Sequence, residues 1–330
     1  MNVTALIVAY HGDQWLPACI DSLIEANNER MHLLLVDNTG NTVFNSLKSE
    51  CFLTEILKTP YPMGFAEANN YALAHAAHLE DTVLFLNQDT ISRPGWIDQC
   101  LRCLEQSPTL GAISPLIETY NGMGWDPSFL DCLSSTDVLP DLFSKQRIAS
   151  EWFHTLNAPA PALIVRKDVL RQTGPFDPVF GSYYEDYDLC RRIRNQGYDI
   201  GFCRSARIAH YSGSTTNTAA RERKRMRQII RNRLLYQLRE SDQPRLPQVL
   251  RQILFDFPRR LARGILKTPS SQPPLVVLKA YGDLLKIAVR LASERRDQEA
   301  WEAYLAGIGW PTGIPGLVDE ATTVERGPGS

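Results

Sequence analysis

Three carboxylates stand within four positions of this 330-residue chain, at Glu185, Asp186 and Asp188, where an amphipathic helical segment begins. The first turn of a helix offers unpaired N–H groups and the positive end of the helix dipole, which keep carboxylates ionised. A fixed, ionised carboxylate is what a general base needs to take a proton from a sugar hydroxyl. Asp188 is better explained as a helix cap, so the catalytic interpretation rests on Glu185 and Asp186.

A second candidate site follows the apolar run Val83–Leu86, where the chain continues Asn87-Gln88-Asp89. This order places a carboxylate at the mouth of a buried strand. Mg²⁺ in proteins typically keeps only one or two protein carboxylates and takes its other ligands from water and phosphate. Asp89 is therefore expected to hold a divalent cation on a diphosphate. Capping of the next helix is the alternative, although residues 93–95 separate Asp89 from that helix.

Two more side chains end predicted strands. His210 could complete the metal shell beside Asp89, and imidazole suits Mn²⁺ better than Mg²⁺; a purely structural histidine is the alternative. Asp37, followed by Asn38, could accept a hydrogen bond from a nucleobase or a ribose. A turn-forming Asp-Asn pair explains the same spacing equally well.

Gly64 precedes a predicted helix whose first turns carry Asn69 and Asn70. Glycine permits close approach of the backbone, and a helix start attracts phosphate. The sequence contains neither a Walker-type lysine nor G-x-G-x-x-G, so P-loop and dinucleotide-binding functions are disfavoured.

The elements that must position these residues alternate over the first hundred positions. Strands are expected at 4–9, 32–36, 53–57 and 82–86, with helices at 15–26, 43–49 and 66–78. This order predicts an α/β fold with a mainly parallel sheet between two helical layers. Ligands of such sheets bind beyond the carboxyl ends of the strands. The ends at residues 10–12, 37–40 and 87–89 should therefore meet in one crevice.

The alternation weakens after a helix at 96–104 and a strand at 112–114. A long loop is expected at 121–141 and a strand at 162–165, then the acidic helix closed by Gly197, and short strands at 199–203 and 207–210. We predict a nucleotide-sugar-binding half at 1–105, an acceptor-binding half of the same domain at 106–215, and a helical basic region at 216–330.

The composition is that of an ordinary globular protein, with 44% hydrophobic and 22% charged residues. The first residues read as a strand rather than a signal peptide, and no apolar run reaches the roughly 18 residues of a membrane span. Seven scattered cysteines fit a reducing compartment. Cys100-x-x-Cys103 lies in a predicted helix and is interpreted as core packing. A cytoplasmic location is expected.

The charge is unevenly distributed, because residues 221–267 carry a net +10 while the remainder carries −12. Within this segment Met226, Ile229, Ile230 and Leu234 recur at helical spacing, opposite arginines. Either the apolar face packs on the catalytic domain with its arginines in solvent, or the basic face attaches to an anionic membrane on its cytoplasmic side. Nucleic acid is disfavoured, since no recognised motif accompanies the charge.

Several motifs occur in one order along residues 1–215. They read Y-H-G, V-D-N-T, M-G-F-A-E-A-N-N, L-F-L-N-Q-D-T, G-P-F-D-P-V-F, Y-E-D-Y-D-L-C-R-R-I-R-N-Q-G-Y and A-R-I-A-H-Y-S-G. This series resembles the inverting family 2 glycosyltransferases of GT-A fold, and most of all their rhamnosyltransferase-like branch, which builds bacterial surface polysaccharides. The resemblance implies a nucleotide-diphosphate sugar donor, such as dTDP-rhamnose or a UDP-hexose, and a glycan or lipid-linked saccharide acceptor.

The resemblance also implies a role for each candidate residue. Asp186 matches the general base, Glu185 its acceptor-side partner, Asp89 the metal ligand of a D-x-D-type motif, and His210 a histidine that ligates Mn²⁺ or Mg²⁺ in some members. The implied donor-binding set is Ala9, Tyr10, Asp37, Asn38, Gly64, Asn69, Asn70, Asn87 and Gln88.

Two departures from the family pattern stand out. Asn87 replaces the first acid of the metal motif, and prolines at 159 and 161 occupy the acceptor-side strand. Two other functions compete with sugar transfer. A sugar-phosphate nucleotidyltransferase would need a basic loop after the first strand, which reads A-Y-H-G-D-Q-W-L-P. A non-catalytic donor-binding relative would not need the retained acid pair.

Overall fold

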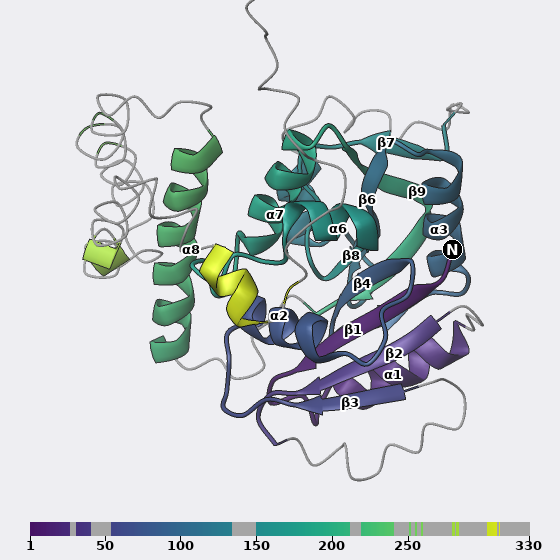
Figure 1. Cartoon of the computed structure of the whole chain (residues 1–330), viewed down its shortest axis with the longest axis horizontal. Coiled ribbons are helices and arrows are strands. Elements are labelled where there is room, and N and C mark those ends of the chain that lie inside the picture. Colours follow the sequence, from purple (N-terminus) through teal and green to yellow (C-terminus); the bar gives the residue numbers. More distant parts are fainter. Residues whose placement is uncertain are drawn as a thin grey trace, which may run out of the picture.

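The computed structural model describes residues 1–26, 31–40, 54–133, 150–211 and 219–240, with 251, 255, 259, 279–280, 282–283, 302–308 and 310. Within these residues a nine-stranded sheet runs in the order β3-β2-β1-β4-β8-β6-β9-β5, and β7 pairs with β9 (Figure 1). The strands are β1 (Val3–Ala9), β2 (Met31–Asp37), β3 (Thr54–Lys58), β4 (Thr82–Asn87), β5 (Thr90–Ser92), β6 (Leu110–Thr119), β7 (Trp152–His154), β8 (Ala162–Arg166) and β9 (Asp199–His210). The helices are α1 (Leu16–Glu25), α2 (Phe65–His75), α3 (Trp96–Gln106), α4 (Pro127–Leu133), α6 (Lys167–Thr173), α7 (Glu185–Asn195) and α8 (Ala219–Glu240).

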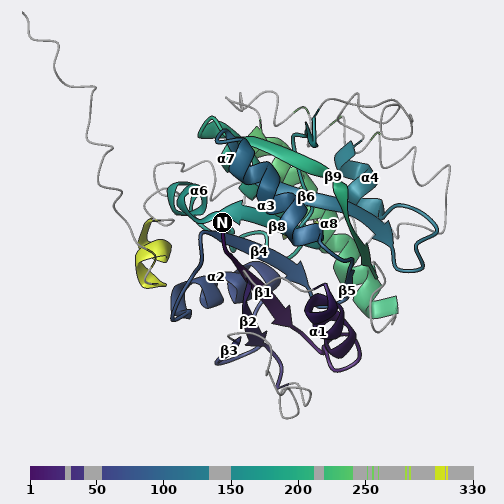
Figure 2. The same cartoon turned by 90° about the vertical axis from the view of Figure 1, so that its right-hand side faces the viewer.

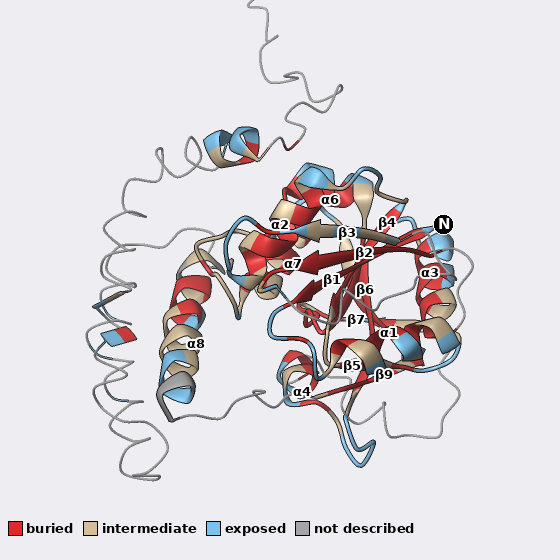
Figure 3. Cartoon of the chain, turned by 90° about the horizontal axis from the view of Figure 1, so that it is seen from below, coloured by how far each residue is buried: buried red, intermediate tan, exposed pale blue. Residues whose placement is uncertain are grey.

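Helices cover both faces of the sheet, with α2, α6 and α7 on one side and α1 and α3 on the other (Figure 3), and α4 contacts α7 through Cys132 and Asp131. Both β1 and β2 are buried along their whole lengths, which explains why their sequences are almost continuously apolar rather than alternating. The expected α/β class, with a sheet between two helical layers, is confirmed.

The parallel half of the sheet brings three strand ends together. β1 lies between β2 and β4, and in this register Ala9 is opposite Asp37 while Val8 is opposite Asn87. The chain moves from β1 to β2 on one side and returns to β4 on the other. This change of direction creates the crevice beyond the strand ends in which open α/β sheets bind ligands.

The other half of the sheet is mixed. β8 runs antiparallel to both β4 and β6, whereas β6 and β9 are parallel. The short strand β5 pairs antiparallel with β9, so that Thr90 is opposite His210. This pairing carries the end of β9 to the residues that follow β4. Figure 2 shows β9 crossing the upper part of the molecule, away from β1 and β2.

Most of the predicted elements are present, with some differences. Residues 199–210 form one strand rather than two, and β5, β7 and α6 were not expected. The prediction of a loop at 121–141 is wrong over 127–133, which form α4, and 134–141 lie outside the described residues. The predicted helix at 43–49 also lies outside them. The division at residues 105 and 215 stays a prediction.

Large apolar side chains fill the space between sheet and helices. Phe85, Trp96 and Phe176 are at most 1% exposed. None of the six cysteines in the described part of the chain forms a disulfide, and all six are buried. Cys100 and Cys103 lie in α3 at 0% and 1% exposure, as expected for core residues.

Helix α8 stands beside α7 (Figure 1) and packs on the segment that precedes it. Leu234, Leu235 and Tyr236 are at most 5% exposed and form a cluster with Phe180. The apolar face of α8 therefore contacts the α/β domain. Among the described residues, no helix is long and apolar enough to cross a membrane.

Candidate active site

The carboxamide of Gln88 joins the ends of β1 and β4. Its Oε1 accepts a hydrogen bond from Tyr10 N at 3.0 Å, and its Nε2 donates to Tyr10 O at 2.9 Å. A Cβ at Gly12 would come within 2.3 Å of Gln88 Oε1, so glycine is required there for the pairing to form. The pairing fixes the backbone at Tyr10, where the sequence predicts nucleoside binding.

Asn38 holds the next strand end in place. Its Oδ1 accepts from Met63 N at 2.8 Å and its Nδ2 donates to Met63 O at 2.9 Å. Asp37 is 8% exposed and lies opposite Ala9 in the sheet register. The two residues are close to the crevice as expected, with Asn38 engaged by the backbone of the chain itself.

The start of α2 is covered by another segment of the protein. A Cβ at Gly64 would lie 3.5 Å from the backbone of Gly181, and Ala66 N donates to Gly181 O at 2.8 Å. The close backbone approach predicted for Gly64 is thus made to Gly181. A role of this helix start in binding phosphate stays a prediction.

Asn69 and Asn70 are buried, at 1% and 0% exposure. Asn69 Nδ2 donates to Phe65 O at 2.9 Å. The Asn70 carboxamide donates to Phe176 O at 2.6 Å and accepts from Phe176 N at 3.0 Å. Both amides are bonded to backbone, so these asparagines are placed to shape the walls of a donor site through the segments they hold.

His210 lies between two carboxylates at the end of β9. Its Nδ1 is 2.9 Å from Asp126 Oδ2, and its Nε2 is 3.4 Å from Asp89 Oδ1 and 3.4 Å from Asn87 Nδ2. Burial lowers the pKa of His210, but the hydrogen bonds to Asp126 and Asp89 outweigh it and raise the pKa to about 9. The structure therefore brings together the two residues predicted to hold a metal.

Asp126 was not identified from the sequence. Its side chain is fully buried; Oδ1 accepts from Ser128 N at 2.8 Å at the start of α4, while Oδ2 holds His210. The order Asp-Pro-Ser at 126–128 is a typical helix start, but a long loop was expected there. The contact to His210 spans 84 positions and has no local signal.

The pair Asp89 and His210 fits a divalent cation of the predicted kind. The described part of the chain contains no group of three or more His, Cys, Asp or Glu arranged as a metal site. A histidine whose Nδ1 is held by a carboxylate and whose Nε2 faces a second carboxylate is nevertheless a recurrent arrangement for metal binding. Two protein ligands suffice when a substrate diphosphate and water supply the rest.

The acid pair lies at the start of α7. Asp186 Oδ2 accepts from Ala160 N and Oδ1 from Tyr187 N, both at 2.9 Å. Burial raises the pKa of Asp186 to about 6 against the opposing effect of these N–H groups. Glu185 is 5% exposed, its Oε2 has no hydrogen-bond partner among the described residues, and burial followed by the charge of Asp186 raises its pKa well above the usual range.

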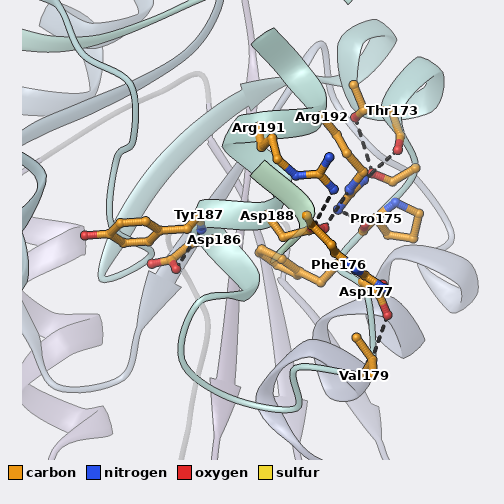
Figure 4. A network of polar contacts seen from close by, with 12 residues as sticks. Thr173, Pro175, Phe176, Asp177, Val179, Asp186, Tyr187, Asp188, Arg191 and Arg192 are labelled. Atoms are coloured by element: carbon orange, nitrogen blue, oxygen red, sulfur yellow. Dashed lines mark hydrogen bonds and ion pairs between the residues drawn. The ribbon is translucent and has the colours of Figure 1, made fainter. Parts of the chain in front are cut away.

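Asp188 has different surroundings. Its carboxylate oxygens lie 2.8 Å from Arg191 Nη2 and 2.8 Å from Arg192 Nε, on the side of α7 away from Asp186 (Figure 4). Burial opposes ionisation, but the charges of Arg192, Arg239 and Arg191 lower its pKa to about 2. The predicted capping role is wrong, since Tyr184 is the N-cap residue; Asp188 forms a buried ion-pair cluster instead.

The segment 159–161, which contains two prolines and forms the wall of the site before β8, connects the two ends of the site. Ala160 N donates to Asp186, and Pro161 O accepts from Asn87 N at 3.0 Å. Burial raises the pKa of Tyr183, and the charges of Glu185 and Asp89 raise it further. The acid pair is therefore linked through residues 160–161 to the end of β4, which leads to Asp89. This arrangement of sheet crevice, carboxylate–histidine pair and buried acids defines a GT-A-type glycosyltransferase domain.

Comparison with known proteins agrees with this class. Residues 1–230 match the family model "Glycosyltransferase like family 2", and the chain belongs to that family. It is 30% identical to the pre-mycofactocin glycosyltransferase of Mycobacterium tuberculosis over 161 residues, 47% of this chain and 32% of the relative. The chain thus spans about a third of the length of that relative.

Two other matches cover a larger share of the matched protein's length. The N-acetylglucosaminyl-diphospho-decaprenol L-rhamnosyltransferase of M. tuberculosis is 23% identical over 232 residues, 63% of this chain and 76% of the relative. The mannosyltransferase PcManGT from Pyrobaculum calidifontis, solved with GDP-Man and Mn²⁺, superposes with a TM-score of 0.56 at 16% identity, covering 93% of this chain and 85% of the other. The latter likeness supports the GT-A fold.

Proposed function

We propose that the protein is an inverting glycosyltransferase that moves a sugar from a nucleoside-diphosphate donor to an acceptor hydroxyl. The observation that carries the proposal is the pair of contacts through the 160–161 wall, which ties Asp186 to the strand end that carries Asp89. A base and a site for a leaving diphosphate must be held at a fixed separation for a single displacement. The family membership supports the same reaction.

In this mechanism Asp186 takes the proton of the acceptor hydroxyl as that oxygen bonds to the anomeric carbon. The bond from the anomeric carbon to the diphosphate oxygen breaks on the opposite face, so the configuration inverts. The pKa of about 6 suits the task, because a base is most effective when its pKa lies near the working pH. Mn²⁺ or Mg²⁺ held by Asp89 and His210 would neutralise charge on the diphosphate.

Glu185 takes the second role in the pair. Two neighbouring carboxylates in a site of low polarity do not both ionise readily, and burial followed by the charge of Asp186 raises the pKa of Glu185 well above its usual range. We propose that Glu185 is the member of the pair that holds a proton when only one of the two is ionised. It can then donate a hydrogen bond to an acceptor oxygen while the charge stays on Asp186.

The donor is proposed to be dTDP-rhamnose or a UDP-hexose. A relative whose name identifies it as a rhamnosyltransferase supports the first. The proposed donor contacts are the backbone at Ala9 and Tyr10, the side chains of Asp37 and Asn87, and the segments held by Asn38, Gly64, Asn69, Asn70 and Gln88.

The acceptor is proposed to be a glycan or a lipid-linked saccharide reached from a membrane surface. Of the α8 side chains, Arg223, Lys224 and Arg233 are exposed, and basic residues near an anionic bilayer contribute about 1 kcal/mol each. Co-sedimentation with vesicles containing 30 mol% phosphatidylglycerol, compared with neutral vesicles, tests the proposal. A triple Arg223→Gln, Lys224→Gln, Arg233→Gln variant should lose the difference, and equal pelleting of wild type with both vesicles would contradict membrane attachment.

The sugar-transfer proposal is tested by a donor screen. Release of nucleoside diphosphate from dTDP-rhamnose, UDP-glucose, UDP-N-acetylglucosamine and GDP-mannose is measured with Mn²⁺, with Mg²⁺ and with chelator. One donor should be consumed faster than the others, and Asp186→Asn should abolish the release while dTDP or UDP still binds. Binding of a nucleoside diphosphate without turnover of any donor, with or without acceptor extract, would favour a non-catalytic binding protein.

A further inference from the structure

The backbone that leads into α7 has an unusual conformation. Gly181, Tyr183 and Tyr184 all have positive φ, at 69°, 69° and 70°. For a residue other than glycine this left-handed region costs free energy, and it persists only where the surroundings enforce it. Tyr183 and Tyr184 directly precede Glu185 and Asp186, so this turn sets the direction in which the helix with the acid pair begins.

Asn232 of α8 is buried against this turn, with 0% exposure. Its Nδ2 donates to the carbonyl oxygens of Phe180 at 2.7 Å, Ser182 at 2.8 Å and Tyr183 at 2.6 Å. Its Oδ1 accepts from Arg231 Nε at 2.7 Å. Three carbonyl oxygens that converge on one point require a donor there, and they share the two hydrogens of the carboxamide NH₂.

Other residues of α8 hold the same segment. Arg231 Nη2 donates to Val179 O at 2.7 Å and Phe180 O at 3.0 Å, and Gln228 Nε2 donates to Phe180 O at 3.2 Å. On the other side, Ala66 N of α2 donates to Gly181 O at 2.8 Å. The turn is therefore held between α2, which follows the nucleoside-binding strands, and α8.

We propose that Asn232 is a positioning residue for sugar transfer. It acts through the turn 180–184, which it holds in the left-handed conformation that places Glu185 and Asp186 opposite the Asp89–His210 pair. The proposal rests on the glycosyltransferase function proposed above. It assigns to α8 a part in building the active site, in addition to any contact with a membrane.

Asn232→Asp is the sharpest test, because it keeps the shape of the side chain and replaces the donating NH₂ with an oxygen that faces three carbonyls. Hydrogen–deuterium exchange of the amides at 182–188 should become about tenfold faster or more. Leu101→Ala, in the core of α3 at 0% exposure, is the control for general loss of stability. Asn195→Asp, at the exposed end of α7, is the control for the chemical change.

The kinetic arm separates positioning from folding. With the best donor of the screen, Asn232→Asp should lower kcat about 10²-fold, as expected when a base is displaced by about 1 Å, while UDP or dTDP binding with Mn²⁺ changes less than about twofold. Both controls should keep kcat near wild type at a temperature where they are folded. Asn232→Ser, which retains one donating hydroxyl, should be intermediate and replaces Asn232→Asp if the latter does not fold.

Two results would overturn the proposal. One is exchange at 182–188 in Asn232→Asp that matches Leu101→Ala, and the other is an unchanged kcat despite faster exchange. If the wild-type protein turns over no donor, the proposed function fails. The exchange measurement then decides by itself whether Asn232 holds the turn.

Discussion

Helix α7 carries two aspartates, two positions apart, in opposite electrostatic surroundings. Asp186 accepts hydrogen bonds from the backbone N–H groups of Ala160 and Tyr187 and has a pKa raised to about 6. Asp188 faces Arg191 and Arg192 in the interior and has a pKa lowered to about 2. Asp188 is fully buried and Asp186 partly buried, and the arginine cations lie beside Asp188.

The difference teaches how one helix start supports both reactivity and stability. A carboxylate surrounded by guanidinium groups is held ionised and gains little by binding a proton. A buried carboxylate without a cation binds a proton readily, which is the property of a base. Arg192 also donates to the carbonyl oxygens of Thr173 and Pro175, so the Asp188 cluster joins α7 to the segment after α6.

The largest expected effect is that of Asp186→Asn on turnover. The amide can still accept from Ala160 N, but it cannot take a proton, so kcat should fall by about 10²–10⁴-fold, the usual contribution of a general base. The stability should change little, because loss of a carboxyl with a raised pKa favours folding, while the amide NH₂ loses one of the two backbone N–H bonds. Steady-state kinetics and thermal unfolding at pH 7 measure the two properties.

The matched comparison is binding of UDP or dTDP with Mn²⁺, which Asp186→Asn should leave unchanged. Turnover close to wild type would remove Asp186 from the role of base. A large loss of stability would instead show that Asp186 resembles Asp188.

Asp188→Asn should have the next largest effect, on stability. It leaves Arg191, Arg192 and Arg239 without their shared carboxylate, and breaking a buried ion pair typically costs about 3–5 kcal/mol. Urea unfolding should show this loss in the free energy of unfolding. Arg225→Gln, which removes a half-exposed cation paired with Glu222 at 3.5 Å, is the surface control, and an equally small effect of both variants would contradict the structural role.

The sequence predicted the strand ends better than the contacts between them. Continuous apolar runs at β1, β2 and β4 identify buried parallel strands, and the polar residues that follow mark the crevice. The acids at 185 and 186 were predicted from their spacing, and their catalytic roles stay predictions. Asp126 and Asn232 were missed, because their partners lie 84 and about 50 positions away and no local pattern encodes such contacts.

The part played by Asp188 shows the same limit. Three acids at a helix start look alike in sequence, and a capping role was expected for this one. Its true surroundings depend on Arg239 of α8, which lies 3.5 Å from it, and on the direction of each side chain around the helix. Position on a helix face is readable from spacing, whereas the charge that meets that face depends on tertiary packing.

Asp126 extends the comparison to the other end of the site, where a buried carboxylate meets a histidine. Asp126→Asn should free His210 Nδ1 from its carboxylate and so weaken Mn²⁺ binding by about 10–100-fold, as is usual for carboxylates that orient metal-binding histidines. Electron paramagnetic resonance titration of Mn²⁺ in the presence of UDP or dTDP measures this. Asp98→Asn, in the first turn of α3, is the control, and equal Mn²⁺ affinities would exclude the orienting role.

The smallest expected effect is a gradual change of kcat/KM and of stability with pH, which distinguishes Asp186 from Asp188. Asp186 should be protonated as the pH falls through about 6, so kcat/KM should decline about tenfold per pH unit below that value. The folded-state pKa of Asp186 exceeds its ordinary value of 3.8, so acidification through pH 6 favours folding at this residue.

The pKa of Asp188 is lowered from 3.8 to about 2. Asp188 therefore stabilises the fold fully above about pH 4 and loses that contribution only as the pH falls toward 2. Activity at pH 5 should therefore be low while the Asp188 contribution to stability is intact. Measuring kcat/KM and the unfolding temperature on the same samples from pH 4 to 8 tests this, and a loss of activity that follows the loss of structure would erase the distinction between the two residues.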